Sequence, residues 1–212
     1  MKHLLLSALL CASAVLCRAS ETVATSAATL ELTSPTCELT PQLFTPDWQW
    51  YRASGGLVRE ADGSYAFKIE TKSAGTVSGK AVFTPTTNGA VDAVYTFTPE
   101  RDITLNALYV GTSLPTDHWA GGGFNAMTGR PDGDGRLPVR HMGLNVFTCP
   151  VSSLSLFPPS SRERLTFRFP EPTPVMIQDD RQWGPSFSVR IGCLTAKTFK
   201  AGEAYTVRFT LA

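Results

Sequence analysis

Apolar and polar residues alternate along much of the chain, which is the pattern of strands with one buried face. The alternation is clearest at residues 65–70, 103–110, 164–169, 187–191 and 205–211. No segment keeps a helical period over three turns, so helices beyond one or two short turns are not expected. The pattern therefore predicts an all-β protein.

One hairpin is the most specific element of this pattern. The β-rich runs 76–83 and 91–98 flank Asn88 and Gly89, a dipeptide that favours hairpin turns. With the weaker strands expected at 30–32, 139–147 and 154–157, the chain holds about ten or more antiparallel strands. This number favours a two-sheet β-sandwich that occupies residues 30–212 as a single domain.

The strand pattern also predicts a core and the segments that interrupt it. The core candidates are Phe67, Ile69, Val94, Phe97, Leu105, Phe167, Phe169, Val189, Ile191, Val207 and Phe209. Alternation is lost between Gly111 and Pro138, which predicts a long irregular loop of the kind that often carries binding residues. The prolines at 170, 172 and 174 predict an extended connector.

The N-terminus has the layout of a secretory signal. Lys2 and His3 precede an apolar run at 4–16 and a cleavage region near Ala19, so residues 1–19 are expected to be a signal peptide. The run is shorter than the roughly 20 residues of a membrane span. Residues 20–29 are expected to be a disordered leader, and the mature protein is expected to be secreted or periplasmic, without a membrane span.

Composition narrows the choice of partner. Hydrophobic residues make up 42% of the chain and the net charge is +1, so a nucleic-acid partner has no electrostatic support. Signal cleavage would leave Cys37, Cys149 and Cys193. A disulfide between Cys149 and Cys193 with one spare thiol, and three buried thiols without a disulfide, are both compatible with this count.

Tryptophans in or beside irregular segments are the candidate ligand platforms. Trp48, Trp50, Trp119 and Trp183 all have this setting, in which an exposed ring can stack on the apolar face of a sugar. Packing in the core, or as a cover over it, is the competing interpretation for each of them.

Trp119 is the strongest of these candidates. Three glycines follow at 121–123 and bring no side chain to bury its indole. Its neighbours Asp117 and His118 could hydrogen-bond sugar hydroxyls while the ring covers the apolar face.

Two pairs of aspartates are candidates for chemistry. Asp179 and Asp180 are adjacent, and because successive strand residues point to opposite faces, they are not expected to act on one substrate. Arg181 is expected instead to bridge a carboxylate and backbone carbonyls. Asp132 and Asp134 lie on a glycine-bent loop that suits either a Ca²⁺ ion or a tight solvated turn.

A resemblance rests on the end of the chain. The run 179–183 (Asp-Asp-Arg-Gln-Trp) leads into the strand 187–191 and is followed by the turn region 199–205 and a last strand. In this the chain is similar to the N-terminal supersandwich-like domains that precede catalytic modules in secreted bacterial glycoside hydrolases and polysaccharide lyases. The resemblance implies a non-catalytic, carbohydrate-associated module that binds a polysaccharide or glycan.

Two other functions remain open from the sequence. A structural or cell-surface interaction domain is the first alternative, because a β-sandwich fold does not fix a function. A glycosidase or lyase with paired carboxylates is the second. The chain ends at Ala212 without a catalytic module, so it could be a stand-alone binder or a fragment of a larger enzyme.

Overall fold

The computed structural model describes residues 23–25, 29–31, 37–55, 58–87, 89–129, 133–160 and 162–212. These residues form an all-β structure with one short helix, α1 (Thr116–Trp119). The strands are β1 (Val23–Thr25), β2 (Thr29–Glu31), β3 (Thr40–Phe44), β4 (Trp50–Arg52), β5 (Val58–Arg59), β6 (Tyr65–Glu70), β7 (Thr76–Pro85), β8 (Val91–Pro99), β9 (Ile103–Leu105), β10 (Ala107–Pro115), β11 (Gly123–Met127), β12 (Asp134–Arg136), β13 (Asn145–Phe157), β14 (Leu165–Asp179), β15 (Ser186–Cys193), β16 (Lys197–Phe199) and β17 (Tyr205–Leu211).

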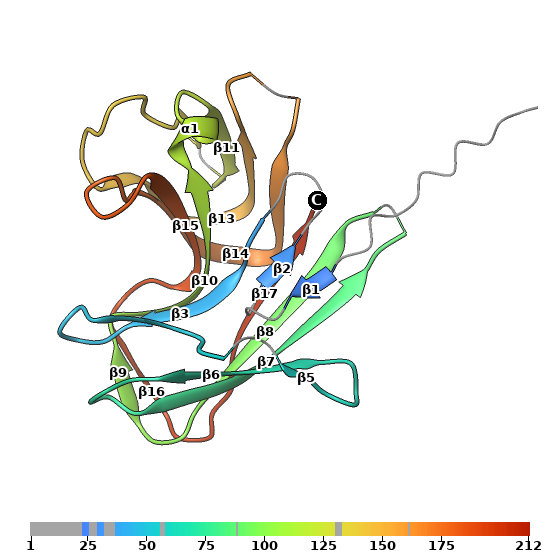
Figure 1. The fold of residues 1–212 in the computed structure, drawn as a ribbon, viewed down its shortest axis with the longest axis vertical. Coiled ribbons are helices and arrows are strands. Elements are labelled where there is room, and N and C mark those ends of the chain that lie inside the picture. Colours follow the sequence, from blue (N-terminus) through green and yellow to red (C-terminus); the bar gives the residue numbers. More distant parts are fainter. Residues whose placement is uncertain are drawn as a thin grey trace, which may run out of the picture.

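One strongly curled antiparallel sheet dominates the fold (Figure 1). Its 13 strands follow the order β4-β3-β10-β15-β14-β17-β8-β7-β6-β5, and β13, β11 and β12 extend from β14. Two small pairs, β1 with β2 and β9 with β16, complete the described strands. The strands that were expected in two separate sheets are thus hydrogen-bonded into a single curled one.

Strand β14 is where this sheet turns a corner. Its first residues pair with β17, as at Phe167 and Leu211, and its last residues pair with β15. The three prolines lie between these two stretches and have no N–H to offer a neighbour. The pairing of β13 with β14 also shifts register between Val151 and Ser153. The expected connector at 170–174 is therefore part of a continuous strand that bends and changes partner.

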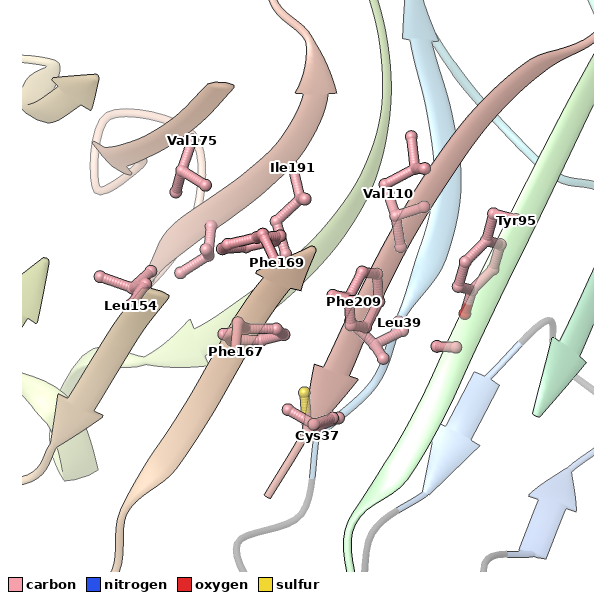
Figure 2. Close-up of a cluster of buried hydrophobic side chains, with 14 of the residues drawn as sticks. Cys37, Leu39, Tyr95, Val110, Leu154, Phe167, Phe169, Val175, Ile191 and Phe209 are labelled. Carbon is pink, nitrogen blue, oxygen red and sulfur yellow. The ribbon is translucent and has the colours of Figure 1, made fainter. Parts of the chain in front are cut away.

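Both parts of the sheet contribute to one core. Figure 2 shows Phe167 of β14 and Phe209 of β17 in the same cluster as Val110 of β10 and Tyr95 of β8. The predicted core residues are buried except Val94, which is half-buried. Val94 lies on the other face of β8, because positions 93, 95 and 97 are the ones that point inward.

Several elements confirm the sequence pattern. The hairpin of β7 and β8 pairs Phe83 with Ala93 across the turn, as expected. Strands β6 and β17 have the predicted bounds of 65–70 and 205–211.

Other predicted segments were wrong. The predicted strand 103–110 is divided at Asn106, whose backbone N–H donates to Phe44 O, so that β9 and β10 belong to different sheets. The segment 139–144 is not a strand, and β13 begins at Asn145. The region expected to be a long loop, 111–138, contains the end of β10, α1, β11 and β12.

Cys37, Cys149 and Cys193 are free thiols, so of the two alternatives the one with a Cys149–Cys193 disulfide is wrong. Cys149 pairs with Val175 across β13 and β14, and Val175 pairs with Ile191 across β14 and β15. Strand β14 therefore separates Cys149 from Cys193, and two inter-strand spacings of about 4.8 Å exceed the reach of a disulfide. Cys37 is buried, and this burial raises the pKa of its thiol to about 12.

Of the residues before 37, the structure describes only two short segments. Val23–Thr25 and Thr29–Glu31 form an antiparallel pair, so part of the expected leader is a strand. The predicted signal peptide, residues 1–19, lies outside the described residues and remains a prediction. Within the described part of the chain, no helix is long and apolar enough to cross a membrane.

Candidate functional site

A cavity of about 600 Å³ lies on the face of β4, β3, β10, β15 and β14 that points away from the core. We call it the aromatic cleft. Its lining is formed by Glu38, Thr40, Gln42, Phe44, Trp48, Trp50, Arg52, Tyr109, Gly111, Thr112, Ser113, Gln178, Asp180, Trp183, Gly184, Ser186, Ser188 and Arg190. Three of the six predicted site residues, all tryptophans, are among them.

We call the surface of this cleft formed by Tyr109, Gly111, Ser188 and Arg190 its floor. Strand alternation places these residues on one face. Val110 and Ile191 face the core, so their neighbours Tyr109 and Arg190 face the cleft. The strands are in register, with Gly111 of β10 opposite Arg190 of β15. Residues far apart in the sequence thereby lie in adjacent rows on one face.

Glycine at position 111 makes room on this floor. A Cβ placed there would stand 2.9 Å from Gln42 Nε2, so the Gln42 side chain lies directly over Gly111. Gln42 also accepts a hydrogen bond from Trp50 Nε1 at 3.0 Å. The indole of Trp50, which is 49% exposed, is thus fixed by a partner on the neighbouring strand.

Trp48 lies at the tip of the turn between β3 and β4. Thr45 organises this turn: its carbonyl accepts from Trp48 N at 2.9 Å, and its hydroxyl accepts from Gln49 N at 3.1 Å. Trp48 has a φ of 60°, the one positive value among the described non-glycine residues. Side chains rarely adopt this left-handed conformation, which costs about 1–2 kcal/mol. The turn therefore holds an exposed indole, in tilted contact with Phe44, at an energetic cost.

Trp183 lies on the other side of the cleft and is 68% exposed, so it does not cover the core. Its turn is closed by hydrogen bonds from Trp183 N and Gly184 N to Asp180 O, at 2.7 and 3.0 Å. The carboxylate of Asp180 accepts from Gln178 Nε2 at 2.8 Å. The side chain of Asp180 belongs to the cleft.

Asp179, by contrast, is fully buried and bound to Arg181. The guanidinium donates to both carboxylate oxygens and also to the carbonyls of Val139 and Pro138. Hydrogen bonding from Arg181 lowers the pKa of Asp179. The predicted bridging role of Arg181 is confirmed. The two adjacent aspartates lie in different environments, Asp179 in the buried ion pair and Asp180 in the aromatic cleft.

The guanidinium of Arg190 lies over two aromatic rings at the centre of the floor. Its Cζ is 5.1 Å from the ring centre of Phe44 and 5.5 Å from that of Tyr109. The two rings are themselves stacked, with centroids 6.0 Å apart. Its ion pair with Asp180 is long, at 3.7 Å. These ring contacts set the position of a cation in the cleft.

Two hydroxyls of the cleft have no hydrogen-bond partner within the described residues: those of Tyr109 and Ser188. Tyr109 is only 1% exposed, and burial raises its pKa to about 12. The nearby Trp50 N–H is directed to Gln42 rather than to the phenol. Buried polar groups without partners are uncommon and call for an explanation at each site.

The structure corrects the prediction for Trp119. Its side chain is 3% exposed and belongs to the core, so the indole has no free face for a sugar. The glycines that follow it allow a close approach of β13: a Cβ at Gly122 would stand 2.4 Å from Phe157 O, and one at Gly123 would enter the Phe157 ring. Glycines at this place are therefore a sign of close packing and not of an uncovered indole.

Asp117 and His118 accompany Trp119 on α1 and are exposed, but neither lines the aromatic cleft. His118 Nε2 lies 3.1 Å from a carboxylate oxygen of Glu163. The predicted site is therefore divided: Trp48, Trp50 and Trp183 surround one cavity, and Trp119, Asp117 and His118 lie elsewhere.

The Ca²⁺ hypothesis remains a prediction. Asp132 lies outside the described residues, and the carboxylate of Asp134 accepts a hydrogen bond from Asn125 at 2.6 Å. The part of the chain that the structure describes contains no group of three or more His, Cys, Asp or Glu residues placed to hold a metal ion.

The floor of the cleft was missed from the sequence. Arg190 and Ser188 alternate with buried residues of β15, which indicates the outer face of a strand but not its neighbours. Tyr109 lies between two core residues of β10 and carries no separate signal.

No protein-family model matches the chain, and no curated protein matches it. Among solved structures, a galactose mutarotase related enzyme from Lactobacillus acidophilus is 9% identical, with a TM-score of 0.40 over 84% of this chain and 82% of that one. A galactose mutarotase-like protein from Lactobacillus casei is 12% identical, with a TM-score of 0.46 over 83% and 84%. Likenesses at this level assign neither a family nor an activity.

Proposed function

We propose that this protein is a carbohydrate-binding module whose ligand occupies the aromatic cleft. One observation carries the proposal: three exposed indoles surround a polar floor on which two hydroxyls lack partners. A sugar ring has apolar C–H faces and a polar edge, and it needs both kinds of surface in one cavity.

The indoles and the floor would divide the binding. Trp48 and Trp50 lie on one side of the cavity and Trp183 on the other, so a sugar ring could stack on either side. Gln42 and Ser188 would then hydrogen-bond the hydroxyls at its edge. This division follows the usual organisation of ligand sites, in which apolar walls give contact area and a few polar groups fix orientation.

A glycan array followed by calorimetry tests the proposal. The variants Trp50→Ala and Trp183→Ala should each lose about 1–3 kcal/mol of affinity, by analogy with aromatic stacking on bases. Met127→Ala, which removes a side chain that is 61% exposed on β11, is the matched control and should bind as the parent does. Absence of any glycan binding by the parent protein, or unchanged binding by both tryptophan variants, would reject the proposal.

The proposal extends to the setting of the module. We infer a sandwich-like single domain that is exported after removal of a signal peptide and acts without catalysis, as an accessory to polysaccharide recognition. The curled sheet around one core and the N-terminal sequence pattern support this view. N-terminal sequencing of the protein expressed with residues 1–19 present tests the export step: a first residue near Ser20 is expected, and an intact Met1 would contradict it.

A structural or cell-surface interaction domain is the second candidate, favoured by a separate observation. Val139, Met142 and Leu144 are apolar and 71%, 86% and 41% exposed on the segment before β13. Apolar groups gathered in one exposed segment are typical of protein contacts. This function predicts that Met142→Ser weakens binding to a protein partner and that Trp50→Ala does not.

An enzyme with paired carboxylates has less support. Asp179 is neutralised by Arg181 on the core side, whereas Asp180 is in the cleft. The adjacent aspartates are therefore not arranged as an acid and a base on one substrate.

A further inference from the structure

Arg190 has an unusual combination of burial and bonding. Its side chain is 13% exposed, yet within the described residues its guanidinium donates no hydrogen bond. Its contacts are the faces of two rings and the long ion pair of 3.7 Å with Asp180. A guanidinium carries five N–H donors in one plane, and leaving them unused in a partly dry site is costly.

Two hydroxyl groups beside Arg190 also lack hydrogen-bond partners among the described residues. Ser188 precedes it by two residues on the same face of β15. Tyr109 lies on the adjacent strand, and its ring contacts the guanidinium. Three hydrogen-bonding groups that are unsatisfied in the protein thus lie together on the floor of one cavity.

We propose that the floor of the aromatic cleft binds the carboxylate of an acidic sugar, such as a uronic acid residue, through Arg190, Tyr109 and Ser188. This inference rests on the proposed function and adds the class of sugar. A carboxylate has two oxygens that accept in the plane of a guanidinium, and its remaining lone pairs accept from hydroxyls. An acceptor-only anion therefore matches a floor of donors better than a sugar hydroxyl does.

Asp180 is the group that opposes this assignment. Its carboxylate lies near Arg190, but at 3.7 Å it is beyond hydrogen-bond distance, and it accepts instead from Gln178. The charged residues that line the cleft are Arg52 and Arg190 against Glu38 and Asp180, so their formal charges cancel. Selectivity for an acid would therefore arise from the position of the donors, not from the net charge of the cavity.

The stacked rings explain how Arg190 could be ready for such a ligand. Phe44 and Tyr109 hold the guanidinium from one side, which restricts its rotation before any ligand arrives. A donor group that is already oriented loses less conformational entropy on binding.

The test uses matched pairs of glycans on an array. Oligosaccharides that contain glucuronate or galacturonate are placed beside the same oligosaccharides after reduction of each carboxyl to a neutral alcohol. The parent protein should retain the acidic member of a pair and bind the reduced member about 10- to 100-fold more weakly, the range expected for hydrogen bonds to a charged group. Arg190→Gln should abolish this preference, and Arg208→Gln, which removes the same charge from an exposed position on β17, should keep it.

Tyr109→Phe distinguishes binding from folding. It removes only a buried hydroxyl that has no partner, so the melting temperature should stay equal or rise, while affinity for the acidic glycan falls. Equal binding of acidic and reduced glycans, with Arg190→Gln unchanged, would overturn the acidic-sugar inference but leave carbohydrate binding intact. Absence of binding to every glycan would overturn both. If Arg190→Gln does not fold, the acid preference of Tyr109→Phe and Ser188→Ala decides, and an unaltered preference in both rejects the inference.

Discussion

The guanidinium of Arg181 donates two hydrogen bonds to the carboxylate of Asp179, from Nε to Oδ1 at 2.8 Å and from Nη2 to Oδ2 at 2.6 Å. The same side chain reaches the carbonyls of Pro138 and Val139, which lie about forty residues earlier in the chain. One ion pair therefore ties the turn that carries Trp183 to the segment before β13.

Removal of Arg181 should destabilise the protein strongly. Arg181→Ala leaves the carboxylate of Asp179 buried without a counter-charge, which typically costs about 3–5 kcal/mol. Urea unfolding monitored by tryptophan fluorescence measures the loss. Arg208→Ala, at an exposed position on β17, is the control and should change the free energy of unfolding by less than about 0.5 kcal/mol. Equal values for the two variants would show that the pair does not stabilise the fold.

The same pair predicts how stability depends on pH. Hydrogen bonding from Arg181 lowers the pKa of Asp179 in the folded state, so the unfolded state binds its proton more readily. The stability that this group contributes is present above its ordinary pKa of about 4 and is lost as the pH falls through the lower folded value. In thermal melts from about pH 6 to about pH 2, the melting temperature of the parent should therefore fall more steeply with falling pH than that of Asp179→Asn. Parallel curves would contradict the assignment.

The positions of the strands could be predicted from the sequence better than the strands with which each one pairs. Alternation located β6 and β17 because one face of each meets the core and the other does not. It failed at Asn106, where one alternating run divides between two sheets, since no local pattern records a change of sheet. It failed again at β14, because prolines usually end a strand and here they accompany a bend.

The candidate site shows the same limit. Trp48, Trp50 and Trp183 were identified by their irregular surroundings, which do keep them exposed. That they surround one cavity depends on β3 and β15 both pairing with β10, which is a long-range fact. The prediction for Trp119 is wrong because glycines do not imply an uncovered ring: they also permit the close approach of another strand.

Replacement of Trp119 should act on stability and not on sugar binding. Trp119→Ala removes a buried indole and should cost about 3–5 kcal/mol, or roughly 10 °C in melting temperature for a protein of this size. Affinity for any glycan bound in the aromatic cleft should stay the same below the melting transition, because Trp119 does not line that cavity. Differential scanning calorimetry and titration of one sample separate the two effects. A loss of affinity in fully folded Trp119→Ala would support the original prediction that Trp119 is a ligand platform.

Alanine at Gly122 should have a similar effect on folding. Its Cβ would stand 2.4 Å from Phe157 O and 2.9 Å from Trp119 O, and both atoms belong to backbone that cannot move aside alone. We expect Gly122→Ala to lower the melting temperature by several degrees, since overpacking typically costs about 1–3 kcal/mol. At Gly184 a Cβ would meet nothing within 4 Å, so Gly184→Ala is the control and should be neutral or slightly stabilising.

Trp48 offers a test in which the usual order of two substitutions is reversed. Its φ of 60° suits glycine, whereas a side chain with a Cβ pays about 1–2 kcal/mol there. Trp48→Ala keeps this strain and Trp48→Gly relieves it, although glycine also makes the unfolded chain more flexible by about 0.4–1 kcal/mol. Trp48→Gly should therefore be the more stable of the two by up to about 1.5 kcal/mol.

At the neighbouring exposed residue Gln49, which lacks a positive φ, the order should be the ordinary one, with alanine above glycine. Urea midpoints for the four variants measure both orders, and the same order at positions 48 and 49 would mean that the turn relaxes and stores no strain. Both Trp48 variants lack the indole that lines the aromatic cleft, so they should lose glycan affinity equally despite their difference in stability. A binding role explains why a strained tryptophan stands at this position, because neither the core nor the turn requires an indole there.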